Sequence, residues 1–494
     1  MKKKIESIIK TKHLFLYLLP IFFIFHRFIQ NYDLISITDA LYILAAYIIA
    51  AFIISIIGSW FFKSRYKACL FGFALLFINF FFGVLWDWLN EIGQNTILTY
   101  YSFQFSAIFI LIVIIFIVLK RKKTISLRMG EVLNIFFLLL LLVDVGWLVL
   151  RITTKNNEIH FQDEITLTPF TGNTKPDIYL IVADEYAGKN ELKDIFEFDN
   201  SGFENELSQR GFHTIQNSTS NYPFTILSMA STLNMAYLKL HNTNLKSNIT
   251  KALVGIKKAS AITFFKKIGY RFNNLSIFQS DDIQNDQNAH YLFSGKQLLT
   301  SPTLLYHLLI ELHYKLVVKR KIKSLDNGVT YQIQKSNDSI YQNTIELSKT
   351  KSNHPFFIYT HLVLPHFLYY FDRNGKPAPF EKLLGNDRSF SKKNYLEYLQ
   401  YANKKFITLI DEIQKNSASP PIIILMSDHG FRELNDRVDK KYQFSNLISI
   451  CIPGTDYSEF YDGMSIVNFF RVFLNTQFGQ TLPLLKDSTV FLQQ

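Results

Sequence analysis

The 494-residue sequence predicts five transmembrane helices followed by one large α/β domain with a mostly parallel sheet. The first 150 residues are dominated by Phe, Ile, Leu and Val, whereas from Lys155 onward apolar and polar residues mix as in globular domains. In that second part short apolar runs alternate with longer helical stretches, which is typical of a parallel sheet covered on both faces. The chain is also long enough to divide into at least two structural units.

Five apolar segments, each near the ~20 residues that cross a hydrocarbon core, form the predicted membrane part. The first is short, but no small-residue cleavage site follows it, so we interpret it as a span rather than a signal peptide. The predicted transmembrane domain covers residues 1–150, with spans at 14–29, 40–62, 68–89, 101–119 and 131–150.

Lys and Arg in the flanks predict the orientation, because these residues resist translocation. Residues 1–13 carry five, residues 63–67 three and residues 120–130 five, whereas residues 30–39 and 90–100 carry none. We therefore expect an integral protein of the cytoplasmic (inner) membrane with a cytoplasmic N-terminus. An odd number of spans then puts the α/β domain in the extracytoplasmic or periplasmic space.

The net charge of +12 partly reflects this topology, and no basic motif suggests nucleic-acid binding. The two cysteines, Cys69 in a span and Cys451 far downstream, are not expected to meet, so no disulfide framework is predicted.

The outer domain is predicted over residues 176–494, after a polar linker at 151–175. Buried strands are predicted at 177–183, 356–360, 422–427 and 447–452, and helices at 226–238, 395–414 and 465–478. Residues 240–300 are assigned no fold. A helix with a basic end at 304–323 is interpreted as a surface helix of this domain in preference to a membrane contact.

Carboxylates and imidazoles follow three predicted strands. Asp184 and Glu185 end the first, His361 ends the second, and Asp428 and His429 end the third. Ligands of open α/β sheets bind beyond the carboxyl ends of strands, and this donor set suits one divalent metal ion, Zn or Mn. Glu185 is an alternative to Asp184, because neighbouring residues of a strand point to opposite faces.

Thr225 precedes a predicted apolar helix. The unpaired amides and the dipole of a helix N-terminus favour a bound phosphate, and a nearby metal would make the hydroxyl a nucleophile. The alternative is a simple N-cap threonine, which local sequence alone favours.

Four segments in this order resemble the alkaline phosphatase and sulfatase superfamily: IVADEYAG around Asp184, NYPFTILSMASTLN from Asn221, THLVLPH from Thr360 to His366, and MSDHG around Asp428. The resemblance covers residues 176 to about 480 and implies a sulfatase-like α/β fold. It further implies metal ligation by Asp184, Thr225, Asp428 and His429, with Thr225 also the transiently phosphorylated nucleophile. His366 would be a catalytic and substrate-contacting imidazole, and His361 and Asn221 would contact the substrate.

Two departures from the superfamily narrow the expected chemistry. Formylglycine sulfatases use a Cys-x-Pro/Ala-x-Arg motif, which neither cysteine matches, so sulfate ester hydrolysis is not expected. No histidine closely follows Asp428-His429, which favours one metal ion over two.

Five spans followed by such a domain resemble lipoteichoic acid synthases and lipid A phosphoethanolamine transferases. The resemblance implies transfer of a phosphoryl-containing head group from a phospholipid donor, through threonine, to an envelope glycolipid or glycan acceptor. A membrane-tethered phosphatase or phosphodiesterase and a catalytically inactive envelope scaffold are the alternatives.

Three ionisable residues in the outer parts of spans, Arg27, Asp87 and Asp144, are expected to cluster, with Arg27 near a lipid phosphate. For Asp87 the alternative is an ordinary position in the interfacial belt.

Overall fold

The chain forms two compact units in the computed structural model. The first is Met1–Glu158 with Phe293–Arg320, and the second is Ile159–Leu292 with Lys321–Gln494. We call them the membrane unit and the sheet unit. The structure describes residues 13–93, 96–154, 161–162, 165–170, 172, 175–240, 245–278, 295–384, 392–432 and 438–491, so the lysines before residue 13 and much of the predicted linker lie outside the described residues.

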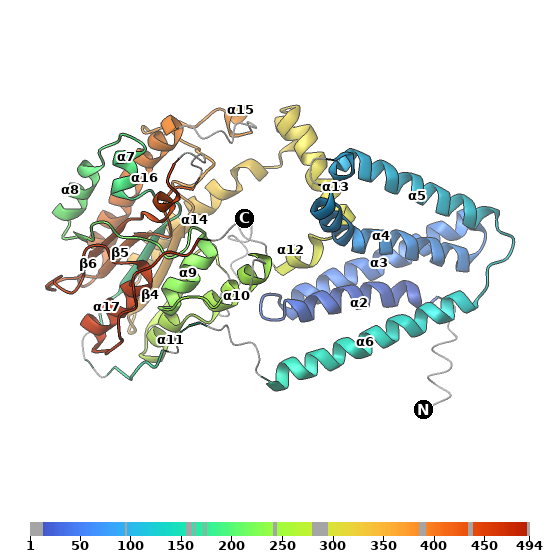
Figure 1. Cartoon of the computed structure of the whole chain (residues 1–494), viewed down its shortest axis with the longest axis horizontal. Helices are drawn as coiled ribbons and strands as arrows, with labels where there is room; N and C mark the ends of the chain where they lie inside the picture. Colours follow the sequence, from blue (N-terminus) through green and yellow to red (C-terminus); the bar gives the residue numbers. More distant parts are fainter. Residues whose placement is uncertain are drawn as a thin grey trace. The chain divides into compact units, whose positions relative to one another are not determined.

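Five apolar helices build the N-terminal part of the membrane unit: α2 (Phe15–Gln30), α3 (Ile37–Phe62), α4 (Arg65–Ile92), α5 (Tyr101–Arg121) and α6 (Arg128–Thr154) (Figure 1). The last four are long and apolar enough to cross a membrane, and α2, at 16 residues, is shorter. Helix α2 packs inside the unit, where Phe15, Leu16 and Leu19 are fully buried. A short 3-10 turn, Ile97–Thr99, precedes α5.

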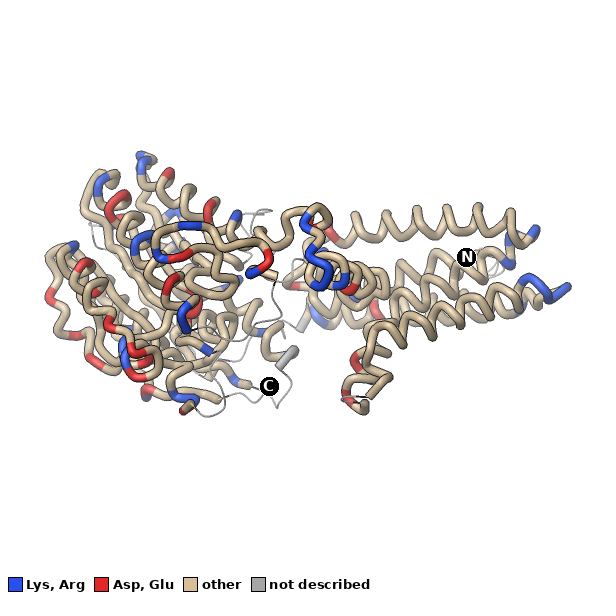
Figure 2. The backbone as a smooth tube through the Cα atoms, turned by 90° about the horizontal axis from the view of Figure 1, so that it is seen from above, with Lys and Arg blue, Asp and Glu red and all other residues tan. Residues whose placement is uncertain are grey.

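The two ends of this bundle differ in charge. The amine of Lys67 donates to the Lys122 carbonyl at 2.5 Å, so the basic loops 63–67 and 120–130 meet at one end. At the other end, Arg151 pairs with Asp33 at 3.2 Å. Figure 2 shows Lys and Arg gathered at one end of the long helices, whose middle parts carry almost no charge. This distribution is the one that the flank counts predict.

A later segment of the chain returns to the membrane unit. It comprises α12 (Gly295–Thr300), α13 (Leu304–His313) and a π-helical turn at Tyr314–Lys319. A guanidinium N–H of Arg27 donates to the Leu298 carbonyl at 2.7 Å, and the Gly83 amide donates to the Pro302 carbonyl at 2.7 Å. The prediction that residues 304–323 form a surface helix of the outer domain is therefore wrong, since most of this segment belongs to the membrane unit.

Two members of the predicted cluster of Arg27, Asp87 and Asp144 have partners other than those expected. Asp144 pairs with His26, Nδ1 to Oδ1 at 2.9 Å, rather than with Arg27, whose guanidinium contacts the return segment and Gln30.

The sheet unit is built on a six-stranded sheet in the order β2-β6-β5-β1-β4-β3. Strands β3, β4, β1 and β5 run parallel, whereas β6 is antiparallel to β5 and to β2. All four predicted strands are present, and the sequence analysis missed the other two. The bounds are β1 (Ile178–Ala183), β2 (His213–Thr214), β3 (Arg271–Leu275), β4 (Phe356–Leu362), β5 (Ile422–Ser427) and β6 (Ile448–Cys451).

Helices cover both faces of the sheet, each over its own hydrophobic core. One face carries α9 (Thr225–Asn234), α10 (Leu245–Lys257), α11 (Ser260–Lys267) and α17 (Ile466–Phe478). The other carries α7 (Lys189–Asp194), α8 (Ser201–Gln209), α14 (Gln332–Ser348) and α16 (Lys392–Asn416). The remaining elements are α15 (Phe380–Leu383) and 3-10 turns at Lys323–Leu325, Val329–Tyr331 and Lys440–Phe444.

Candidate active site

The register of three parallel strands brings Asp184, His361 and Asp428 together. Val182 of β1 pairs with His361 of β4 and with Met426 of β5. Asp184 and Asp428 each lie two residues beyond such a partner, so all three side chains point to one face, the face that α9 covers. Their ligand atoms lie within 4.8 Å of one another.

The donor atoms of this group are buried and unsatisfied, which fits a bound cation. Asp184, His361 and Asp428 are each 0% exposed. Within the part of the chain that the structure describes, both carboxylate oxygens of Asp184, Oδ2 of Asp428 and Nε2 of His361 have no hydrogen-bond partner. The imidazole Nε2 and Oδ2 of Asp184 are 3.4 Å apart, the separation of an ion pair if the ring is protonated. Buried polar atoms left without partners are costly, and a divalent metal ion would satisfy all of them. Two carboxylates with an imidazole suit Zn or Mn.

The pKa values of the carboxyl groups of Asp184 and Asp428 are shifted in opposite directions. Burial alone would raise the pKa of Asp184, but the imidazoles of His366, His361 and His429 outweigh it and lower that pKa. Burial and the neighbouring charge of Asp184 raise the pKa of Asp428 to about 6. Two like charges this close disfavour each other, and a bound cation removes the conflict.

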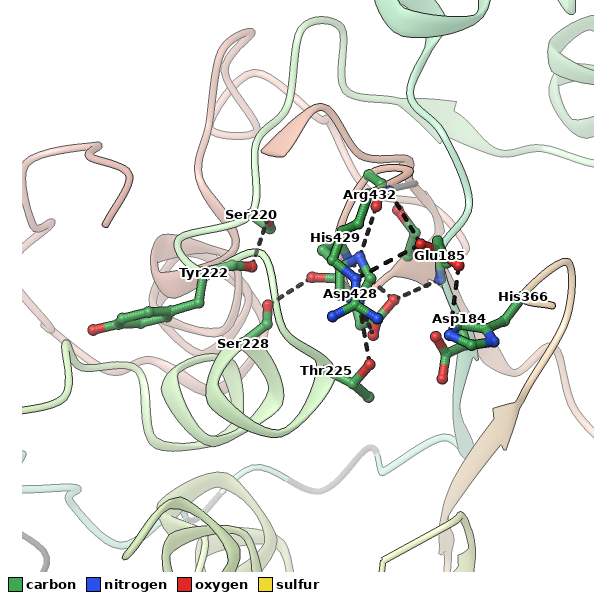
Figure 3. Close-up of polar contacts among 12 residues, drawn as sticks. Asp184, Glu185, Ser220, Tyr222, Thr225, Ser228, His366, Asp428, His429 and Arg432 are labelled. Carbon is green, nitrogen blue, oxygen red and sulfur yellow. Dashed lines mark hydrogen bonds and ion pairs between the residues drawn. The ribbon is translucent and has the colours of Figure 1, made fainter. Parts of the chain in front are cut away.

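Thr225 lies at the first position of α9, where its hydroxyl is 3.2 Å from Nε2 of His429 (Figure 3). The N-cap residue is Phe224, so Thr225 is not the simple N-cap that the alternative interpretation requires. The Nδ1–H of His429 donates to the Gly430 carbonyl at 2.7 Å, which leaves Nε2 as an acceptor facing the hydroxyl. Burial, together with the charge of Arg432, lowers the pKa of His429 to about 4, so the ring is neutral.

The loop that carries His429 depends on a glycine. A Cβ on Gly430 would lie 2.5 Å from the carbonyl oxygens of Ser445 and Tyr442. Glu191, a buried carboxyl, accepts from the Phe431 amide at 3.1 Å and anchors the same loop. Burial raises the pKa of Glu191 well above its usual range.

His366 and Glu185 form a second pair beside the group. Nε2 of His366 is 3.5 Å from Oε2 of Glu185, and Oε1 accepts from the Arg432 amide at 3.0 Å. Burial lowers the pKa of His366, but the carboxylates of Glu185 and Asp184 outweigh it and raise that pKa. Arg432 also lies over the Phe224 ring at 5.2 Å, next to Thr225.

The predicted site residues lie in different surroundings in the structure. His361, expected to contact substrate, lies instead with Asp184 and Asp428 in the candidate metal group. Glu185 faces His366 and Arg432, so Asp184 holds the position in that group. His429 lies beside it, with Nε2 3.2 Å from Oδ2 of Asp428.

Asn221 does not join the site. Its amide N–H groups donate to Tyr237 and to the Ser488 carbonyl, and its oxygen accepts from the Val467 amide. These bonds tie the C-terminal segment to the unit and occupy both N–H groups of the Asn221 side chain, which was expected to contact the phosphate. Arg373 is also occupied elsewhere, since it pairs with Glu397 on the surface.

Comparison with solved structures gives distant similarities. The C-terminal periplasmic domain of EcEptC from Escherichia coli, in complex with Zn, is 12% identical over 63% of this chain and 87% of that chain, with a TM-score of 0.39. The corresponding domain of phosphoethanolamine transferase EptC from Campylobacter jejuni is 11% identical over 61% and 89%, with a TM-score of 0.36. A phosphonate monoester hydrolase from Silicibacter pomeroyi is 12% identical over 64% and 75%, with a TM-score of 0.40.

No curated protein sequence matches the chain. The family model described as Sulfatase matches residues 187–446, a range that includes Thr225, His361, His366, Asp428 and His429. Because this range is more than half of the 494 residues, the chain belongs to the Sulfatase family, within the alkaline phosphatase superfamily.

Proposed function

We propose that the protein is a metal-dependent phosphoryl-group transferase that moves a phospholipid head group, through Thr225, to an envelope glycolipid or glycan. The observation that carries the proposal is a buried hydroxyl at a helix N-terminus, 3.2 Å from a neutral imidazole, beside a buried and unsatisfied Asp-His-Asp group.

Asp184, His361 and Asp428 would hold one divalent metal ion, Zn or Mn, with His429 and Thr225 next to it. A metal in this position neutralises negative charge on a phosphate and lowers the pKa of a neighbouring hydroxyl. Phosphoryl transfer depends mainly on positioning and charge neutralisation, which this group supplies.

The chain's own residues can account for the proton movements. The Thr225 oxygen bonds to phosphorus as its proton passes to Nε2 of His429, and the bond from phosphorus to the lipid's glyceryl oxygen breaks. His366, whose pKa is raised by Glu185 and Asp184, can donate a proton to the leaving oxygen. The first amides of α9 and the guanidinium of Arg432 stabilise the phosphate charge. In the second step an acceptor hydroxyl displaces Thr225.

The second step separates this proposal from its alternative, a membrane-anchored phosphatase or phosphodiesterase in which water displaces Thr225. The described residues include four helices long and apolar enough to span a membrane; these would hold the enzyme beside a lipid donor, which favours transfer. A formylglycine mechanism is not proposed, because both cysteines are buried outside the site, Cys69 in α4 and Cys451 in β6.

We further propose that the sheet unit faces the periplasm or cell exterior. The return segment that arrives from that unit contacts Arg27, Gly83 and Asp39, all at the bundle end away from the basic loops. A cytoplasmic sheet unit would put this end on the basic side, against the distribution of Lys and Arg.

Trapping the intermediate tests the proposal. Incubation of the full chain with a phospholipid donor carrying isotopic label in its head group should give a labelled Thr225 peptide by mass spectrometry. Thr225→Ala should lose both the label and turnover, by at least about 100-fold, because the nucleophile is gone. Thr232→Ala is the matched control, since the hydroxyl of this buried threonine of the same helix donates to the Ser228 carbonyl at 2.8 Å.

The acceptor decides between the two activities. Diacylglycerol release only when a glycan acceptor is present, with the labelled head group recovered on that acceptor, supports transfer. Equal diacylglycerol release in water alone, with the head group recovered as a free phosphate ester, supports hydrolysis. Full turnover in Thr225→Ala rules out the threonine intermediate in either case.

A further inference from the structure

Helix α13 exposes an apolar face. Leu305, Leu308, Leu309 and Leu312 follow the i, i+3, i+4, i+7 spacing of one helical face, and their exposed fractions lie between 44% and 56%. We call these four residues the leucine face. Water-soluble surfaces rarely present such a contiguous apolar stripe, so the face needs an apolar partner.

The opposite side of α13 is fixed to the second half of α4 and to the start of α5. Nδ1 of His307 is 2.8 Å from the Tyr101 hydroxyl at the start of α5, and its ring lies 5.3 Å from Trp86 of α4. Asn79 of α4 accepts the Leu305 amide at 3.1 Å, which caps the helix start. These contacts hold α13 within the depth range of α4 and α5 while its leucine face remains open.

The surroundings of the leucine face are those of a bilayer interface. The same two helices expose Val84 (65%) and Phe103 (40%), which is expected of surfaces that face acyl chains. Beyond α13 the π-helical turn becomes basic, with exposed Lys315, Lys319 and Arg320. An apolar face followed by cationic side chains is the pattern of helices that lie in the boundary between acyl chains and anionic head groups.

We propose that α13 is an interfacial membrane helix. Its leucine face lies among the acyl chains of the leaflet next to the outer ends of α4 and α5, and the basic turn lies at the level of anionic lipid phosphates. The protein then has a membrane contact that is contributed from within the sequence of its sheet unit, between β3 and β4, in addition to its N-terminal helices. This proposal concerns lipid contact alone and does not depend on the reaction.

Fluorescence quenching by brominated lipids tests it on the full chain in nanodiscs of phosphatidylethanolamine and phosphatidylglycerol. After Cys69→Ala and Cys451→Ala, an environment-sensitive probe is attached at Leu309→Cys. Leu142→Cys on α6 (67% exposed) is the lipid-facing control, and Leu484→Cys in the sheet unit (50% exposed) is the control outside the spans. We expect blue-shifted emission at 309 and quenching comparable to that at 142, several-fold stronger than at 484.

Weak quenching at 309, equal to that at 484, would overturn the proposal. Blue-shifted emission without quenching would also overturn it, because the face would then be covered by protein. Leu305→Cys repeats the measurement on the same face if Leu309→Cys does not fold, as judged by size-exclusion chromatography. None of these readouts uses activity, so a failed transferase assay leaves the outcome unaffected.

Discussion

Among the described residues of the candidate site, Asp184 has the most buried polar atoms without a hydrogen-bond partner. Its carboxylate is fully buried, neither oxygen has a hydrogen-bond partner among those residues, and the neighbouring imidazoles lower its pKa and so keep it ionised. An ionised buried carboxylate without donors is tolerated only beside a compensating positive charge. A metal ion supplies that charge and uses the unpaired atoms of His361 and Asp428 as well.

Metal content should therefore depend on His361. The wild-type chain is expected to hold about one equivalent of Zn or Mn, and His361→Gln and Asp184→Asn should each lose most of it, because a ligand is removed. Elemental analysis by inductively coupled plasma mass spectrometry measures this content. His213→Gln is the matched control, since that imidazole stacks on Tyr457 away from the site.

The same experiment distinguishes two ligand sets. If Asp184, Thr225, Asp428 and His429 alone held the metal, as the family resemblance implies, His361→Gln would keep full content. Loss in Asp428→Ala with His429→Ala is expected from either set.

At the level of single residues, the sequence indicated which candidate residues stand at strand ends and helix starts, but not which distant residues they contact. Asp184, Thr225 and Asp428 could be proposed because each stands at an element boundary, at a strand end or a helix start. The place of His361 depends on its pairing opposite Val182, and register between distant strands cannot be read from local patterns. The partners of the Asn221 side chain, Val467 and Ser488, come from the end of the chain, so local sequence could not predict them.

At the level of elements, prediction succeeded where burial is complete. The central strands β1, β4 and β5 and the long helix α16 follow from uninterrupted apolar runs and a clear helical period. Strand β3 (RFNNL) escaped notice because two asparagines break its apolar pattern. The orientation of β6 also could not be predicted, since an apolar run carries no direction. Helix α13 was placed in the wrong unit because its leucine stripe is equally suited to a protein core and to lipid.

Docking of the return segment should depend on Gly83. A Cβ at this position would lie 2.7 Å from backbone atoms of Pro302, whose carbonyl accepts the Gly83 amide. Gly83→Ala should lower the free energy of unfolding of the membrane unit by about 1–3 kcal/mol, because the segment must shift outward. The thermal unfolding midpoint in detergent measures this, together with the rate of proteolysis between α12 and α13.

Gly146→Ala is the matched control, because a Cβ on that glycine of α6 would meet nothing within 4 Å. Equal midpoints for the two variants would mean that the close approach of Pro302 does not contribute to stability.

At the scale of the whole molecule, the family match and the apolar helices occupy different parts of the chain. The Sulfatase match covers residues 187–446, a range that holds Thr225, His361, Asp428 and His429, and among the described residues four helices of spanning length precede it. In the proposed reaction, the nucleophile, the cation and the phosphate-binding groups do not by themselves select a lipid donor. The apolar helices of the same chain would bring the enzyme to a membrane that contains that donor.

Topology can be tested without reference to the reaction. A reporter that is active only outside the cytoplasm, fused after Gln494, should be active, because thirteen Lys and Arg lie on the predicted cytoplasmic side and none in the two outer loops. The same reporter fused after Lys123, in a basic loop, should be inactive. Reversed activities would put the sheet unit in the cytoplasm and remove its access to envelope acceptors.

The place of the return segment in the sequence sets the order in which parts of the sheet unit are synthesised. Strand β1 pairs with β4, joining residue 178 to residue 357, and residues 293–320 lie between them in the chain. During synthesis, α12 and α13 therefore emerge before β4, the strand that completes the parallel pair with β1. An excised soluble version of the sheet unit would have to form this pair while carrying, between the two strands, a segment that packs in the membrane unit of the whole protein.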